Sequence, residues 1–544
     1  MSETLINNPL YKYFLSVQFG GKEIQKWKTL QHNGVLFPPE YVPHNIPILV
    51  KGNPIKLPLL AEEYATLYAK YIDSEYIRHA SFRRNFWRDW KLTIRGLNIF
   101  SLDDCDFTLI RKHIDKQREI LANLSKEDKL KIKEIKDKQA EPYKIAIVDG
   151  QPQPVGNFRM EPSGIFLGRG NHPKLGSIKK RIYPEDVTLN LGKEAPIPST
   201  IPGHKWGNII HDKIVEWLAS WKDPISNKVK YVWLASHSDL RMQSDKDKFE
   251  LARKLNKIIN EIRQKNQENM TSTDPTTRQL ATALYFIDIL ALRVGNEKGE
   301  DQADTVGVTS LRVEHIHLLD DNTFRIKLDF LGKDSIRYLN ELNVDEQVYK
   351  NLKEFITNKT KDDELFELVN SIAINKYLQT FFPELTAKVF RTYNASYMFQ
   401  EEITNINKKY KSYDKADRMQ VLMDLYNKAN IRVALLCNHQ KNVLKGFKDQ
   451  LQKIDSKILE LKQKKLTAKN PKKIQEIIKK LRYKKEVKHQ LKNISLVTSK
   501  TNYIDPRITV SFMKFHDIPI EKMFSKTLME KFKWAFDVPA NWVF

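Results

Sequence analysis

The pattern of hydrophobic residues predicts a mixed α+β fold in which helices dominate. Long stretches repeat apolar residues every three to four positions, which is the period of an amphipathic helix. The most apolar of them, Ala281 to Leu292, predicts a buried helix that ends at Arg293, with Gly295 as its C-terminal cap. Because an unpaired buried arginine is unfavourable, Arg293 is expected to have a partner or to meet an anion.

One stretch after this helix follows the period of a strand. Its apolar residues alternate with polar ones and predict a half-buried strand; they are Phe324, Ile326, Leu328 and Phe330. Residues 332–335 then form a turn into a second strand, so that Lys333 lies at the tip of a hairpin. A lysine at such a tip can contact an anionic partner or simply be solvated.

Two further helices carry polar residues that suit a binding site. Residues 385–403 predict a helix that bears Arg391 and Asn394, and a second helical pattern ends at His439. Leu435 and His439 are four positions apart and would share one face, which directs His439 towards the apolar side. A core histidine with satisfied hydrogen bonds is the alternative to a functional one.

Residues 441–492 predict an antiparallel helical hairpin of the coiled-coil type. Apolar residues recur at alternating intervals of three and four, and Asn470-Pro471 interrupts them between the two helices. The segment has 18 Lys or Arg against 5 Asp or Glu, so an anion is expected nearby. The seam residues are Leu444, Phe447, Leu451, Ile454, Ile458 and Leu461 before the break and Ile474, Ile477 and Leu481 after it.

A loop rich in glycine and basic residues lies near position 170. Three glycines allow its backbone to approach a ligand closely, and the spacing matches no nucleotide-binding glycine motif. We interpret it as a phosphate-contacting loop, with an ordinary basic turn as the alternative. The residues that carry this interpretation are Arg169, His172, Lys174, Lys179 and Lys180.

The net charge indicates a polyanionic partner. Among 544 residues, 91 Lys and Arg outnumber 67 Asp and Glu, which gives a formal charge of +24. Nucleic acid is the usual partner of such a chain, and an anionic membrane surface is the competitor. No apolar stretch reaches the roughly eighteen residues of a spanning helix, so no membrane is expected. Between Arg83 and Lys91, cations interleave with aromatic residues, and we favour a helix with its aromatics in the core over a DNA-facing surface.

Neither a cofactor nor a metal is expected. The two cysteines, Cys105 and Cys437, are too few for a disulfide framework and suit a reducing compartment. The cysteines and 13 histidines form no CxxC or HxxxH spacing, and no P-loop is present in the sequence. The first residues resemble neither a signal peptide nor an arginine-rich transit helix.

A single tyrosine stands out near the C-terminus. Tyr503 follows the lysine-rich hairpin and precedes a turn that contains proline. A tyrosine that packs its ring at the start of a terminal subdomain is the ordinary interpretation. The arginines, lysine and histidine upstream favour phosphate chemistry instead.

Five ordered blocks of sequence resemble eukaryotic-type DNA topoisomerase I, the type IB family. They read ALRVGNEK at 291–298, FLGKDSIR at 330–337, LTAKVFRTYNAS at 385–396, LCNHQ at 436–440 and SKTNY at 499–503. The similarity extends from about Lys26 to Phe544. It implies an enzyme that relaxes supercoiled DNA without ATP or metal, by cleaving one strand, letting the duplex rotate and religating it.

The family's catalytic residues match five positions of this chain. The nucleophile matches Tyr503, which would form a 3′-phosphotyrosyl link to the cleaved strand. Arg293, Arg391 and His439 would stabilise the charge on the non-bridging oxygens. Lys333 would protonate the leaving 5′ oxygen.

The resemblance also implies residues that contact double-stranded DNA. Arg169, Asp334 and Asn502 match family residues near the cleavage site that also line the camptothecin pocket, so inhibitors of that class are expected to bind the cleavage complex. Most contacts would go to phosphates, which predicts weak sequence selectivity and strong salt dependence. The set is completed by His172, Lys174, Lys179, Lys180, Asn394, Gln440 and Thr498.

The family's architecture is a multi-lobe clamp that closes, as a monomer, around a duplex. It implies a tail at 1–24, a cap lobe at 25–237, a catalytic core lobe of the tyrosine-recombinase and type IB kind at 238–442, a projecting coiled-coil linker at 443–494 and a C-terminal domain with the nucleophile at 495–544. Two positions depart from the family pattern. Leu167 replaces an arginine, and Gln302 replaces an acidic residue thought to close the clamp by pairing with Lys174. Either Glu300 or Asp301 substitutes for it, or closure is weaker.

Two other functions fit parts of this pattern. A tyrosine site-specific recombinase uses the same catalytic residue types but lacks the linker hairpin, and a non-catalytic DNA-clamping chromatin protein would not need all five. The long charged N-terminal extension typical of nuclear family members does not precede the matched region. The nucleus is the expected compartment, with a mitochondrion or a viral or cytoplasmic replication site as alternatives.

Overall fold

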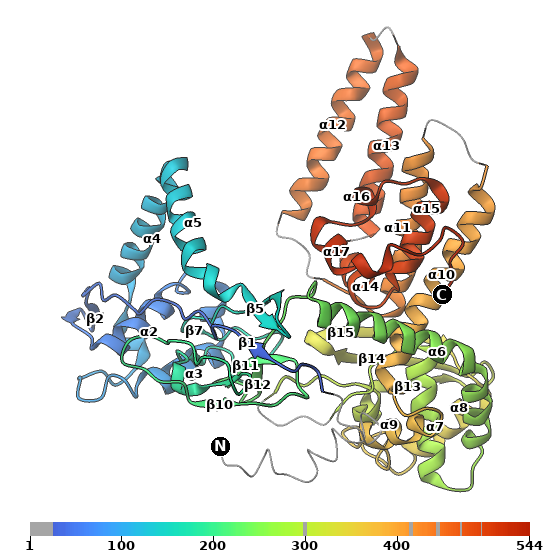
Figure 1. Cartoon of the computed structure of the whole chain (residues 1–544), viewed down its shortest axis with the longest axis horizontal. Coiled ribbons are helices and arrows are strands. Elements are labelled where there is room, and N and C mark those ends of the chain that lie inside the picture. The colour runs from blue at the N-terminus through green and yellow to red at the C-terminus, as the bar shows by residue number, and fades with distance from the viewer. Residues whose placement is uncertain (1–24, 297–301, 413–416, 442–445, 468–469, 491) are drawn as a thin grey trace. The chain divides into compact units, whose positions relative to one another are not determined.

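The computed structural model describes residues 25–296, 302–412, 417–441, 446–467, 470–490 and 492–544 (Figure 1). The contacts divide the chain into two compact units, and the boundary falls within helix α6 (Asp239–Met270). The first unit comprises Met1–Ser244 and Lys298–Thr305, and the second comprises Asp245–Glu297 and Val306–Phe544. Both units contain helices and strands, so the expected α+β class is confirmed.

Short sheets form the framework of the first unit. A four-stranded sheet has the order β10 (Asn208–Ile210), β9 (Val187–Asn190), β11 (Trp217–Lys222) and β12 (Val229–Trp233), in which β10 and β9 are parallel. Two antiparallel three-stranded sheets join β1 (Leu30–Gln31), β5 (Ile145–Val148) and β6 (Gln151–Pro154), and β3 (Asn53–Ile55), β2 (Ile48–Val50) and β4 (Cys105–Asp106). Strands β7 (Gly164–Ile165) and β8 (Ile178–Lys179) pair with each other and frame the basic loop.

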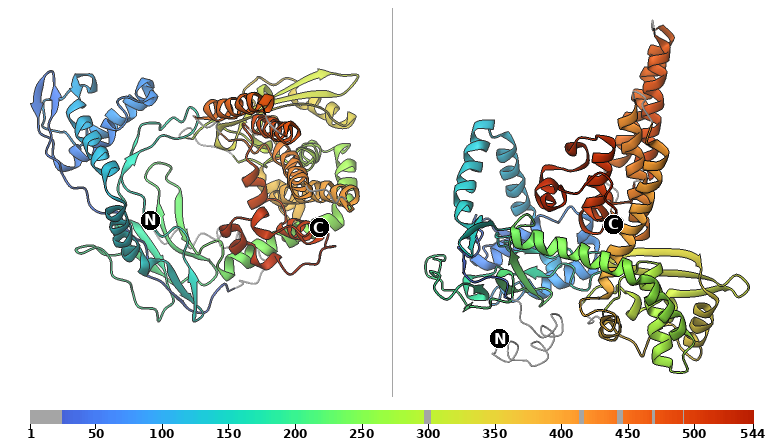
Figure 2. Two further views of the ribbon diagram at one scale, coloured as in Figure 1. Left: turned by 90° about the horizontal axis from the view of Figure 1, so that it is seen from above. Right: turned by 45° about the vertical axis from the view of Figure 1, so that its right-hand side comes forward.

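Helices pack beside these sheets for reasons visible in their sequences. They are α2 (Leu59–Ala69), α3 (Ala80–Trp90), α4 (Thr108–Asn123) and α5 (Lys126–Ala140). In α3 the rings of Phe82, Phe86 and Trp90 recur every four residues and are fully buried, which confirms the core interpretation of this segment. Helix α5 begins where the Ser125 hydroxyl accepts a hydrogen bond from the backbone N–H of Asp128. Helices α4 and α5 lie side by side in both figures (Figure 2).

The second unit surrounds one three-stranded antiparallel sheet with helices. The sheet has the order β13 (Ile316–Asp320), β14 (Arg325–Gly332) and β15 (Ile336–Asn343). As predicted, Ile326, Leu328 and Phe330 of β14 face the core. The helices are α7 (Pro275–Ile289), α8 (Glu346–Ile356), α9 (Ser371–Gln379), α10 (Ala387–Tyr410), α11 (Arg418–Leu436), α12 (Phe447–Thr467), α13 (Pro471–Gln490), α14 (Leu496–Asn502), α15 (Pro506–His516), α16 (Ile520–Met523) and α17 (Lys526–Lys531).

Helices α12 and α13 form the predicted antiparallel pair. Lys465 contacts Gln475 near the connection, Lys485 bonds Asp455 further along, and Lys488 bonds Gln450 towards the open end. Lys, Asp and Gln side chains thus bridge the two helices along their length.

The seam of this pair differs from the prediction at one position. In α13 Ile478 is buried, whereas Ile477 is 40% exposed, so a helical step of four from Ile474 places Ile478 in the seam. The predicted seam residue Leu444 lies outside the described residues.

The predicted end of the helix before Arg293 is wrong. Helix α7 stops at Ile289, so Gly295 does not cap it. Gly295 instead has a φ of +87°, and a Cβ there would lie 2.8 Å from the Cα of Gly307. It is a glycine because two backbone segments meet at this point.

None of the helices that the structure describes is long and apolar enough to cross a membrane.

The glycines of the basic loop serve the packing of the protein itself. Gly176 has a φ of +91°, and a Cβ at this position would lie 2.2 Å from the backbone oxygen of Phe82 in α3. A Cβ on Gly168 would similarly lie 2.7 Å from the Cβ of His172. The loop is therefore shaped by close contacts with α3 and within itself.

Replacing Gly176 by Ala should lower the free energy of unfolding by at least about 3 kcal/mol, because the left-handed backbone costs about 1–2 kcal/mol and the Cβ must also displace the α3 backbone. The control is Gly150→Ala, where φ is +78° but no atom lies within 4 Å of the new Cβ. Calorimetric unfolding of both variants measures the difference. Equal losses would show that the contact with α3 is not what requires a glycine.

Candidate active site

Arg293 lies on an irregular segment after α7. Main-chain bonds from Val308 and Thr309 to the carbonyls of Arg293 and Val294, at 2.9 and 2.7 Å, hold this segment. The Arg293 side chain is exposed, and its Nη2 lies 3.3 Å from the Tyr503 hydroxyl. The partner expected for Arg293 is thus the tyrosine itself.

Lys333 lies at the predicted hairpin tip. Strands β14 and β15 pair up to Gly332 and Ile336, and Asp334 and Ser335 between them adopt positive φ values of 67° and 57°. This tight turn leaves Lys333 exposed at the end of a rigid sheet.

Arg391 projects from helix α10 and is buried, at 8% exposure. Its Nη2 donates to the Cys437 carbonyl, while its Nε has no partner among the described residues. Burial lowers the pKa of this guanidinium, and the neighbouring charge of Arg293 lowers it further. An oxyanion would supply the missing acceptor.

His439 is buried for a different reason from the one predicted. Helix α11 ends at Leu436, and Leu435 is 59% exposed, so the two residues do not share a helix face. The helix ends in a Schellman motif, in which Asn438 has a φ of 49° and the N–H groups of Asn438 and His439 donate to the carbonyls of Leu435 and Ala434. This cap turns the chain back and places His439 inside.

Tyr503 follows helix α14, and its ring is surrounded by the other candidates. The rings of Tyr503 and His439 stack with centroids 5.1 Å apart, and the Arg391 guanidinium lies 5.4 Å from the Tyr503 centroid. The Ser495 N–H donates to the His439 carbonyl at 2.8 Å, which joins the start of the Tyr503 segment to the end of α11.

The residues that contact Tyr503 line one pocket of about 140 Å³ in the second unit, whereas Tyr503 itself is not among the lining residues. Seven of the predicted site residues line it, and they are Arg293, Lys333, Asp334, Arg391, His439, Gln440 and Thr498. The described residues include no group of three side chains suited to hold a metal ion.

The electrostatics of the pocket favour an anion. Both ring nitrogens of His439 are buried without a hydrogen-bond partner among the described residues. Burial, with the charges of Arg391 and Arg293, lowers the pKa of His439 to about 3. The imidazole is therefore neutral at pH 7 and can donate one N–H to a ligand.

Two predicted residues of the second unit have other surroundings. Asn394 donates from Nδ2 to the Asp288 carbonyl and so ties α10 to α7. Asn502 is exposed, and its Nδ2 donates to the Thr498 carbonyl.

The other predicted DNA contacts belong to the first unit. Arg169 and Lys180 are exposed. His172 packs its ring against that of Phe166, with the two ring centroids 4.7 Å apart. Lys179 is paired with Glu161, and burial with the nearby Lys230 lowers the pKa of Lys179 to about 8.

Clamp closure was expected to involve Lys174. Its Nζ donates to the Ile225 carbonyl at 2.7 Å, and Gln302 accepts from Lys228 at 3.1 Å. The substitutes Glu300 and Asp301 lie outside the described residues.

Sequence reasoning missed several residues that shape the pocket. Phe330 and Tyr338 form its floor between β14 and β15, and Asn438 donates to the Arg337 carbonyl at 3.3 Å. Asn438 lay within a recognised block, and an Asn two residues after a helix end is itself a signal for a left-handed cap.

Three family models match successive parts of the chain. The model described as eukaryotic DNA topoisomerase I, DNA binding fragment, matches residues 25–234, and the catalytic core of the same enzyme matches residues 237–493. A C-terminal topoisomerase domain matches residues 475–544. The chain belongs to the eukaryotic DNA topoisomerase I family. The predicted resemblance is thereby confirmed, together with the class of type IB DNA topoisomerases and with DNA as the partner.

Curated relatives agree with this assignment. DNA topoisomerase 1 of Caenorhabditis elegans is 44% identical over 94% of this chain and 67% of its own length. DNA topoisomerase 1 beta of Arabidopsis thaliana is 44% identical over 96% of this chain but 59% of its own length, and the Homo sapiens DNA topoisomerase 1 is 43% identical over 94% and 71%. The chain thus spans about six to seven tenths of these relatives.

Replacing His439 by Gln should make the free energy of unfolding less sensitive to pH. In the wild type, the folded state keeps a neutral imidazole with a pKa of about 3, whereas the unfolded state binds a proton near the ordinary value of 6.5. Stability from this group is therefore present above pH 6.5 and is lost as the pH falls towards 3. Urea unfolding without DNA at pH 7, 6 and 5 measures the difference, and parallel curves for both proteins would contradict the lowered pKa.

Proposed function

We propose that this chain relaxes supercoiled DNA by transient cleavage of one strand through a 3′-phosphotyrosyl intermediate, followed by rotation and religation. The observation that carries the proposal is the position of Tyr503. Its hydroxyl lies beside Arg293, and its ring touches His439 and Arg391 of the same cationic pocket. A scissile phosphate in the pocket would meet the nucleophile and the groups that stabilise charge together.

The two arginines and His439 would act on the non-bridging oxygens. In-line attack spreads negative charge over these oxygens, and guanidinium groups hold such charge through paired N–H donors. Arg391 and His439 have buried donors without acceptors among the described residues, so these donors are already desolvated before a phosphate binds. Preorganised donors of this kind are worth more in the transition state than flexible ones in water.

Lys333 would protonate the 5′ oxygen that leaves. Its side chain is exposed at the turn between β14 and β15, so it can reach a strand that lies over the pocket. The phosphotyrosyl bond keeps the energy of the phosphodiester, so religation requires neither ATP nor metal.

The finer architecture and the binding partners belong to the same proposal. We infer a clamp that closes as a monomer around duplex DNA, with the domain limits stated from the sequence and a coiled-coil linker formed by α12 and α13. Arg169, Asp334 and Asn502 would contact DNA near the cleavage site and bind camptothecin-class inhibitors in the cleavage complex. The nucleus is the proposed compartment.

The two departures from the family pattern affect this clamp. Leu167 packs against the hydrophobic cluster of α2 and α3, so a phosphate contact is exchanged for an apolar one. Gln302 carries no charge and accepts from Lys228, so it cannot form an ion pair with Lys174 to close the clamp.

Replacing Tyr503 by Phe should abolish relaxation of a supercoiled plasmid, because the phenol oxygen forms the covalent bond. The assay contains EDTA and no ATP, and denaturing gels report the protein–DNA adduct at the 3′ end. Tyr397→Phe is the matched control, since this tyrosine on α10 is 41% exposed and its ring stacks with neither His439 nor Arg391, as that of Tyr503 does.

Three results would be informative here. A wild type that forms no 3′ adduct contradicts the proposed function. Relaxation by the Tyr503→Phe variant would assign the nucleophile to another residue. Strand exchange between specific sites would instead identify a recombinase.

Removing residues 446–490 should leave cleavage within a fewfold of wild type while changing the salt tolerance of relaxation. The two ends of this segment are already joined, since Lys441 donates to the Asn493 carbonyl at 2.8 Å and Gln440 pairs with Ile494. Adduct formation on an oligonucleotide and plasmid relaxation at rising salt separate the two effects. Complete loss of cleavage would mean that α12 and α13 are needed to position Tyr503.

A further inference from the structure

The backbone of Tyr503 is held by a helix on its N-terminal side alone. Helix α14 ends at Asn502, and Tyr503 has φ −126° and ψ −32° outside it. Its N–H makes the last bond of the helix, to the Ser499 carbonyl at 2.9 Å, and the Arg293 Nη2 lies 3.3 Å from its phenol oxygen. The direction of the ring therefore depends on what fixes the main chain on its C-terminal side.

One buried hydroxyl makes that contact. Ser396 of α10 is 0% exposed, and its Oγ donates to the Tyr503 carbonyl at 2.9 Å. The same oxygen accepts a hydrogen bond from the Asp505 N–H at 3.0 Å. Ser396 thus holds the main chain on both sides of Ile504, and it leaves neither backbone group unpaired.

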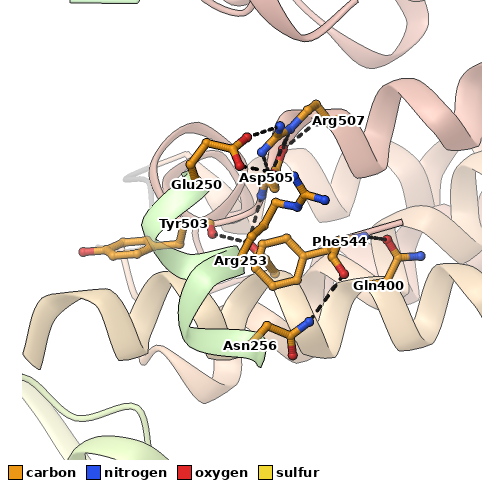
Figure 3. Close-up of polar contacts among 9 residues, drawn as sticks. Glu250, Arg253, Asn256, Gln400, Tyr503, Asp505, Arg507 and Phe544 are labelled. Carbon is orange, nitrogen blue, oxygen red and sulfur yellow. Dashed lines mark hydrogen bonds and ion pairs between the residues drawn. The ribbon is translucent and has the colours of Figure 1, made fainter. Parts of the chain in front are cut away.

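A second anchor begins two residues after Tyr503. The Asp505 carboxylate caps α15 and accepts from the Arg507 guanidinium at 2.7 Å, and the Arg507 Nη1 donates to Glu250 of α6. Trp542 covers this guanidinium at 4.7 Å from its ring centroid. Figure 3 shows that the Tyr503 ring projects away from this cluster, so the cluster fixes the backbone without entering the pocket.

The helix that provides Ser396 also provides Arg391. These residues are five positions apart on α10, and both are buried. A rigid helix that holds the nucleophile's main chain and the phosphate-binding guanidinium sets their distance directly. Misplacement of reacting groups by about 1 Å can cost a hundredfold in rate.

We propose that Ser396 is a positioning residue for the Tyr503 nucleophile, acting through its two hydrogen bonds to the main chain of residues 503–505. This role rests on the proposed function and adds a residue that touches neither DNA nor the reacting atoms. It predicts a defect in the rate of attack and none in DNA binding.

The test compares the wild type with variants in single-turnover cleavage of an oligonucleotide. The short leaving strand of this substrate dissociates after cleavage. Ser396→Ala is expected to lower the saturating cleavage rate at least about tenfold, while the protein concentration at half saturation stays within about twofold. Ser511→Ala is the matched control. Its buried hydroxyl also bonds main chain, because its one proton is shared between the carbonyls of Ala540 and Trp542, and neither belongs to the Tyr503 segment.

A modified leaving group identifies the defective step. A substrate with sulfur in place of the 5′ bridging oxygen needs no acid for departure, so it should restore cleavage by Lys333→Ala and should not restore Ser396→Ala. Ser396→Cys places a slightly larger thiol with weaker hydrogen bonding at this position and should fall between wild type and Ser396→Ala. If calorimetry shows that Ser396→Ala does not fold, the cleavage rate of Ser396→Cys tests the positioning role instead.

The outcomes separate the two proposals. If Ser396→Ala cleaves as fast as the wild type, the positioning role alone is overturned. If the alanine variant is unfolded, the same result in Ser396→Cys overturns it. An equal loss in Ser511→Ala also overturns it, because general loosening of the C-terminal segment would then explain the effect. A wild type that forms no adduct overturns the proposed function and this role with it.

Discussion

The burial of the Arg391 guanidinium is the constraint on which the rest of the pocket depends. A cation removed from water is costly unless an acceptor compensates it. The protein provides one acceptor, the Cys437 carbonyl at the end of α11, and leaves the Nε without a partner among the described residues. The positive charge of the buried guanidinium is therefore incompletely compensated, and a bound phosphate would compensate it.

The arrangement of the elements around the pocket can be understood from this uncompensated charge. Helix α10 must be rigid to keep the guanidinium inside, and its contacts with α7 and α11 and the packing of Phe390 and Phe399 serve that purpose. The capped end of α11 places His439 inside and beside Arg391, so that burial first, and then the charge of Arg391, lower the pKa of the imidazole. Burial thus creates a neutral donor next to a charged one, in a setting where both are stronger than in water.

Tyr503, the proposed nucleophile, lies on a separate segment. Helices α14 and α15 dock on α10 and α11 through apolar residues such as Ile504, Ile508 and Phe512. Around this packing, the ion pair of Asp505 with Arg507 is enclosed between tryptophan rings and tied to Glu250 of α6. Residues more than two hundred positions apart in sequence therefore hold the backbone of one tyrosine.

Elements with a regular hydrophobic period were predicted correctly from the sequence. The predictions were wrong where tertiary contacts determine the local structure. Helix α3 and strand β14 follow from periodicity because a single face of each is buried. The placement of His439 on a helix face was wrong, since a Schellman cap ended α11 three residues earlier. Gly295 was misread because its neighbour Gly307 is remote in sequence, and Ile478 replaced Ile477 because an offset of one residue turns a helical side chain by about 100°.

The residue types of the candidate active site, their order and the family could be predicted from the sequence alone. The types follow from chemistry, because an attacking phenol, phosphate-binding guanidinium groups and an acid are each tied to particular side chains. The distances between them, the burial of Arg391 and the hold of Ser396 on the Tyr503 backbone were decided only by the tertiary structure. Such contacts join segments with no local pattern, so no period or spacing in the chain encodes them.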